Sequence, residues 1–178
     1  MRKAKRQLRY SWFLVVFGIP AFSYADDTVQ KALEDLVCST KWEYLEQQND
    51  IQRARSVSKR NRGIQEILQN KYSFTNWEGA IREIDVVGES GIALTISLKC
   101  KVRIKTWNNT ISDMGDRTII DLDSSIGDFL ANAYIGDKVK VSGTFIPGTD
   151  SHIYESSITE RGRMTEPEYV VHFKKINN

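Results

Sequence analysis

The sequence has few of the residues that build metal centres and covalent catalytic sites. Its 178 residues include only two cysteines and two histidines, and no spacing among them resembles a zinc site. The aspartates between positions 113 and 128 do not follow the spacing of a calcium loop, and there is no Gly-x-Ser-x-Gly elbow. We therefore expect neither a metal ion nor a cofactor.

The sequence also lacks an apolar run long enough to cross a membrane. The stretch from Trp12 to Phe22 has about ten apolar residues, whereas a membrane-spanning helix needs roughly 20. Five basic residues precede this stretch and Ser23-Tyr24-Ala25 follows it, a pattern typical of a secretory signal peptide cleaved after Ala25. Asp26 stands where a lipoprotein would have a cysteine. We expect a periplasmic or secreted protein with no stable membrane anchor after cleavage.

Removal of this segment reverses the sign of the net charge. The whole chain has 25 lysines and arginines against 23 aspartates and glutamates, a formal charge of +2 at pH 7. Five of these cations and none of the carboxylates lie in residues 1–25, which leaves 20 against 23, or −3. A negative chain has no overall basic character that would favour nucleic acid, so any basic binding surface must be local.

The chain after the signal peptide is the size of one domain and can bury a hydrophobic core. Its cysteines, Cys38 and Cys100, predict one structural disulfide in an oxidising compartment, and two buried free thiols are the alternative.

Residues 26–72 have the apolar periodicity of helices. Their middle contains a basic run, and on a helix three of its cations would share one stripe: Arg55, Lys59 and Arg62. Such a stripe either meets an acidic partner or a lipid head group, or is simply the solvated face of the helix.

From residue 73 onward the period becomes that of β-strands. Seven alternate positions are apolar or cysteine: Ile92, Leu94, Ile96, Leu98, Cys100, Val102 and Ile104. A single strand of this length is unusual, so either it is bent or the chain folds back near Lys99-Cys100-Lys101. A three-residue turn would keep the alternation in phase, whereas a two-residue turn would bury Lys101 and Arg103.

The order of the remaining elements completes a recognisable pattern. A short strand is expected at residues 118–120, a helix after Asp123-Ser124-Ser125, and three more strands at 136–145, 153–159 and 169–176. Trp77 shares the phase of the core positions, and we expect Trp42 to pack the helical part against the strands.

About 100 of the 178 residues resemble the OB-like domains of exported bacterial proteins, many of them uncharacterised. The stretches that carry the resemblance are Trp77-Glu78-Gly79-Ala80-Ile81, Thr106-Trp107-Asn108-Asn109 before Ser112-Asp113, residues 136–143, and Thr159-Glu160-Arg161-Gly162. The fold class expected is α+β: a helical segment at 26–72, then at 73–178 a five-stranded OB-like β-barrel with one helix between its third and fourth strands. The resemblance brings no catalytic motif.

What the resemblance implies is a binding surface on the outer face of the second and third strands. The residues expected there are Lys99, Lys101, Arg103, Lys105 and Trp107. They could hold a protein segment or an anionic envelope component, or the cations could merely protect a sheet edge from aggregation. We predict a non-enzymatic binding or adaptor module.

Two other functions were considered: binding of single-stranded nucleic acid and hydrolysis. A protein that binds single-stranded nucleic acid would need several aromatic platforms, and this face offers one tryptophan. A hydrolase would need an acid–base residue, for which His152 is the candidate.

Overall fold

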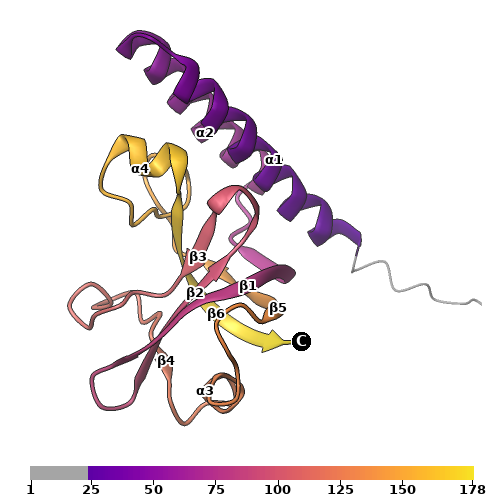
Figure 1. The fold of residues 1–178 in the computed structure, drawn as a ribbon, viewed down its shortest axis with the longest axis vertical. Helices are drawn as coiled ribbons and strands as arrows, with labels where there is room; N and C mark the ends of the chain where they lie inside the picture. The colour runs from indigo at the N-terminus through magenta and orange to yellow at the C-terminus, as the bar shows by residue number, and fades with distance from the viewer. Residues whose placement is uncertain (1–23) are drawn as a thin grey trace, which may run out of the picture.

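The computed structural model describes residues 24–178, so nearly all of the predicted signal peptide lies outside the described residues. The described residues begin with a hairpin of two helices, α1 (Tyr24–Glu46) and α2 (Asp50–Leu68), which lie side by side along one side of a β-barrel (Figure 1). Asn49 caps α2 by accepting a hydrogen bond from the Gln52 amide at 3.0 Å. No described helix is long and apolar enough to span a membrane.

Five strands close the barrel: β1 (Ser73–Val87), β2 (Gly91–Ser97), β3 (Arg103–Lys105), β5 (Lys138–Phe145) and β6 (Glu168–Asn177). β1 pairs with both β2 and β5, β2 pairs with β3, β3 runs parallel to β6, and β6 returns to β5. The short β4 (Ile120–Asp121) adds to β2. The helix α3 (Ser125–Leu130) precedes β5, and α4 (Glu160–Thr165) precedes β6. The predicted α+β class with an OB-like barrel is confirmed.

The alternating segment is two strands joined by a three-residue turn. The turn is η1 (Lys99–Lys101), and its ends are joined by a hydrogen bond of 2.8 Å from the Leu98 amide to the Val102 carbonyl. Ile96 and Ile104 face each other across the hairpin, both fully buried. The chain therefore folds back, and the turn keeps the alternation in phase.

The predicted disulfide between Cys38 and Cys100 is present, with Cα atoms 5.5 Å apart. It joins α1 to the η1 turn, so the alternative of two free thiols is wrong. The bond ties the helical hairpin to the tip of the β2–β3 hairpin.

The core is shared between the barrel and the helices. Trp77 is fully buried, as predicted, and its ring centroid lies 4.9 Å from that of Phe74 and 5.5 Å from that of Phe145. Leu33 of α1 and Ile64 of α2 belong to the same apolar cluster as these rings. The helices therefore pack directly on the barrel.

Two predictions, one about Trp42 and one about residues 153–159, are wrong. Trp42 is 62% exposed, because α1 turns Leu33, Val37 and Tyr44 inward and leaves Trp42 on another face. Residues 153–159 form isolated bridges instead of a strand, at Ile153 and Glu155.

Candidate functional site

Most of the predicted basic face is paired with carboxylates of the same chain. Lys101 lies 2.7 Å from Glu166, and Arg103 lies 3.0 Å from Glu166 and 2.7 Å from Glu168. Lys105 completes the row at 3.3 Å from Glu168. The parallel pairing of β3 with β6 sets Arg103 opposite Glu168, so these contacts follow from barrel closure. We call these five residues the charge ladder.

The remaining two residues of the predicted face lie apart from the charge ladder. The Trp107 indole donates a 2.8 Å hydrogen bond to Asp116, and its ring centroid lies 5.4 Å from that of Tyr154. Lys99 turns toward α1, where its Nζ lies 3.6 Å from Glu34. The structure therefore does not bring the predicted residues together into one free basic surface.

The charge ladder changes the titration of its carboxylates. Burial by itself would raise the pKa of Glu168, but hydrogen bonds from Arg103 and Ser156 and the charge of Lys105 outweigh it and hold the pKa below 4.5. The hydrogen bond from Lys101 lowers the pKa of Glu166 in the same way. Both carboxylates are thus favoured in their ionised form by folding.

Replacing Glu168 with glutamine is expected to lower the free energy of unfolding by about 1 kcal/mol at pH 7, a value reduced by solvent screening. A carboxyl whose pKa is lowered by folding stabilises the protein above its unfolded pKa, here near 4.5, and this contribution disappears as the pH falls through the folded pKa. Urea unfolding at pH 7, 5 and 3 should therefore show the variant converging on the wild type. Glu66→Gln, an exposed change on α2, is the matched control. A difference that is constant with pH would contradict this role.

The second predicted basic patch lies on the exposed face of α2. Lys59 crosses the helical hairpin to pair with Glu43 at 2.6 Å, while Arg55 and Arg62 are exposed. None of the three lines the groove between α1 and the barrel that is described below.

Sequence reasoning missed the neighbouring Arg60, which is 1% exposed and pairs with the buried Glu155 at 2.7 Å. Arg60 also donates to the carbonyl oxygen of Arg163 in α4. The burial of Arg60 could have been predicted from its position in the sequence. It lies four residues before Ile64 and eight before Leu68, on the inward face of α2.

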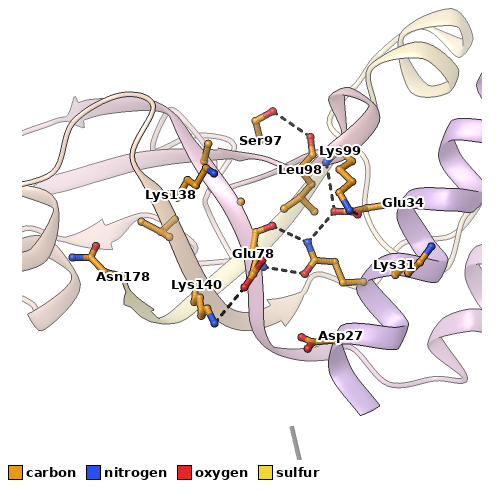
Figure 2. Close-up of a pocket in the computed structure, with 14 residues that line it drawn as sticks. Asp27, Lys31, Glu34, Glu78, Ser97, Leu98, Lys99, Lys138, Lys140 and Asn178 are labelled. Carbon is orange, nitrogen blue, oxygen red and sulfur yellow. Dashed lines mark hydrogen bonds and ion pairs between the residues drawn. The ribbon is translucent and has the colours of Figure 1, made fainter. Parts of the chain in front are cut away.

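A groove of about 700 Å³ lies between α1 and the barrel (Figure 2). One wall is the first half of α1, and the other consists of the start of β5 with the end of the chain. The middle of β1 and the residues at the end of β2 form the floor, where Gly79, Ala80 and Leu98 supply apolar surface. A groove of this size suits a small ligand or a few residues of an extended chain.

Gln30 fixes the α1 wall against β1. Its amide donates to the Glu78 carbonyl at 2.7 Å and accepts from the Glu78 backbone amide at 2.9 Å. These backbone groups need such a partner because the pairing of β1 with β2 begins only at Ala80, opposite Ser97. One side chain of α1 thus replaces a neighbouring strand and holds the groove in shape.

Charged side chains of both signs line the groove. Its lysines are Lys31, Lys99, Lys138 and Lys140, and its carboxylates are Asp27, Glu34 and Glu78. Lys140 pairs with Glu78 at 3.3 Å and Lys31 with Asp35 at 2.6 Å. Lys138 makes no ion pair or side-chain hydrogen bond with any residue in the described part of the chain.

The other sites considered from sequence have structural explanations. His152 stacks on Tyr72 with centroids 4.7 Å apart and does not line the groove. Asp113 accepts a hydrogen bond from the Thr118 hydroxyl at 2.8 Å, so it holds its own loop. Among residues 24–178, no group of three or more histidines, cysteines or carboxylates could hold a metal ion.

No family model, curated protein or solved structure matches the chain. The function proposed below is therefore inferred from the geometry of the groove.

Proposed function

We propose that the protein is a non-enzymatic binding module that holds an acidic segment of a partner in the groove between α1 and the barrel. The observation that carries this proposal is Lys138, an exposed cation next to Lys140 that has no ion pair among residues 24–178 and lies above an apolar floor. A carboxylate in the groove would meet both lysines, while aliphatic parts of the ligand would cover Gly79 and Ala80. The favoured partner is an exported protein; an anionic envelope glycan is the second candidate.

An exported, oxidising environment fits this proposal. The disulfide between Cys38 and Cys100 is typical of such compartments, and the first 25 residues have the pattern of a signal peptide. The sequence pattern of exported OB-like domains supports the same compartment.

The groove supports this function better than the charge ladder does. The cations of the charge ladder already have carboxylate partners within 3.3 Å, and an incoming anion would have to replace them. For the same reason we do not propose single-stranded nucleic acid, for which the ladder with Trp107 would have been the platform. The hydrolase alternative has no support from His152, which stacks on Tyr72 outside the groove.

Replacing Lys138 with glutamate is expected to weaken the binding of an acidic peptide by about tenfold or more, because it removes an attraction and adds a repulsion. The measurement is fluorescence anisotropy of a labelled hexapeptide rich in glutamate, at low and at physiological salt. The protein is expressed from the full chain and purified in its oxidised form. A labelled anionic glycan fragment, titrated in parallel, distinguishes the two kinds of partner.

The control is Lys174→Glu, which makes the same charge change at an exposed site on β6 outside the groove. Equal affinities of the two variants would show that the peptide is attracted only by net charge. Failure of the wild-type protein to bind either probe would reject the proposal.

A further inference from the structure

Glu34 is a buried carboxylate in the wall of the groove. Its side chain is only 4% exposed. One oxygen accepts a 2.9 Å hydrogen bond from Gln30 and lies 3.5 Å from the Lys99 backbone amide. An ionised carboxylate can accept about four hydrogen bonds, and its burial is costly unless it is paired. Glu34 therefore retains capacity for another donor.

The cation that pairs with Glu34 is loosely held. Lys99 Nζ lies 3.6 Å from the second carboxylate oxygen, beyond hydrogen-bond length, and the lysine side chain is 77% exposed. A lysine on a flexible four-carbon stem can swing into solvent at little cost. Another cation that enters the groove could then take its place beside Glu34.

The opposite side of the groove carries the reverse charge. Figure 2 shows Glu34 on α1 and Lys138 on β5 on opposite sides of Glu78, with Lys140 reaching toward Glu78. Glu78 and Lys140 already pair with each other, and Asp27 is exposed to solvent. Glu34 is therefore the buried carboxylate of the groove, and Lys138 is a cation to which the described residues offer no ion pair. They differ in sign and belong to different walls.

We propose that the ligand is zwitterionic. Its amine or guanidinium donates to Glu34 in place of Lys99, its carboxylate meets Lys138, and its uncharged middle lies on the apolar floor. The class is a peptide or peptide-like segment with a cationic and an anionic side chain a few residues apart. This inference rests on the proposed function and adds a second, cationic subsite to it.

The test compares two families of capped peptides. One has the sequence acetyl-Lys-(Gly)n-Glu-Glu-amide with one to four glycines; the other replaces the lysine with methionine and keeps the anionic end. Calorimetric titration of the oxidised protein should show that the best lysine peptide binds about tenfold tighter than its methionine counterpart, the gain typical of one charge-assisted hydrogen bond.

Two variants test whether Glu34 and Lys99 determine the preference for the lysine peptide. Glu34→Gln keeps the shape of the side chain and should remove the preference, so that the lysine and methionine peptides bind this variant equally. Lys99→Met removes the competing cation and should increase the preference. Thermal unfolding of both variants identifies any loss of structure, and an exposed change, Lys174→Met, is the control.

The outcomes separate this inference from the proposed function. Equal binding of the two peptide families by the wild type overturns the cationic subsite and leaves the anion-binding groove intact. Weaker binding of both families by Lys99→Met also overturns it, because Lys99 would then be a ligand for the anion. Absence of binding by either family overturns both proposals.

Discussion

Replacing Arg60 with methionine is expected to lower the free energy of unfolding by about 3–5 kcal/mol. Arg60 and Glu155 form an ion pair of 2.7 Å in which the two side chains are 1% and 4% exposed. Loss of the guanidinium would leave the Glu155 carboxylate buried without its cation. Burial already raises the pKa of Glu155 against the opposing effect of Arg60, so the variant should hold this carboxyl protonated.

Urea unfolding of the Arg60→Met variant provides the measurement. Arg62→Met, two residues along the same helix and exposed, should stay within about 0.5 kcal/mol of the wild type. The double variant Arg60→Met with Glu155→Leu should recover much of the loss, because an apolar pair of similar volume avoids the buried unpaired charge. Equal stability of Arg60→Met and Arg62→Met would contradict the role assigned to this pair.

Removing the disulfide by Cys38→Ser and Cys100→Ser together is expected to cost about 4 kcal/mol of unfolding free energy, from the chain entropy that a bond across 62 residues removes from the unfolded state. Because the bond also joins α1 to the η1 turn, the groove wall should lose its anchor, and the acidic hexapeptide should bind more weakly.

Urea unfolding of the double serine variant and of the reduced wild type should give the same lowered midpoint. The oxidised wild type is the reference for both. A serine variant as stable as the oxidised protein would show that packing of α1 alone holds the helical hairpin in place.

The local pattern of the chain predicted the barrel well. Alternation from Ile92 to Ile104 identified the inner face of β2 and β3. The phase excluded a two-residue turn, which would have buried Lys101 and Arg103, but it did not decide between a three-residue turn and a long bent strand. The burial of Trp77 was predicted in the same way, from its position in phase with the other core residues. These features depend on neighbours in the sequence, which is why the sequence alone predicts them.

The candidate site depends on contacts between distant segments. Glu166 and Glu168 lie more than 60 residues from the cations they pair with, and only the parallel pairing of β3 with β6 brings them together. The groove similarly depends on the Gln30 amide, which meets the backbone of Glu78 48 residues away. Sequence periodicity does not predict contacts between such distant residues. The basic residues of β3 could therefore be predicted from the sequence, but their carboxylate partners could not.

Trp42 and Arg60 show a related limit. A tryptophan on a helix is usually buried and an arginine usually exposed, yet each residue here follows its helical face instead of its type. Because Arg60 lies on the same helical face as Ile64 and Leu68, the spacing of these three residues predicts that its side chain is buried.

The position of a bound acidic peptide distinguishes the groove from the charge ladder most directly. Backbone amide chemical shifts of the isotope-labelled, oxidised protein should be followed by NMR during titration with the glutamate-rich hexapeptide. We expect the largest changes at Gly79, Ser97, Lys99 and Val139, which line the groove. Changes confined to Arg103, Lys105 and Trp107, with the groove residues unaffected, would contradict the proposed function.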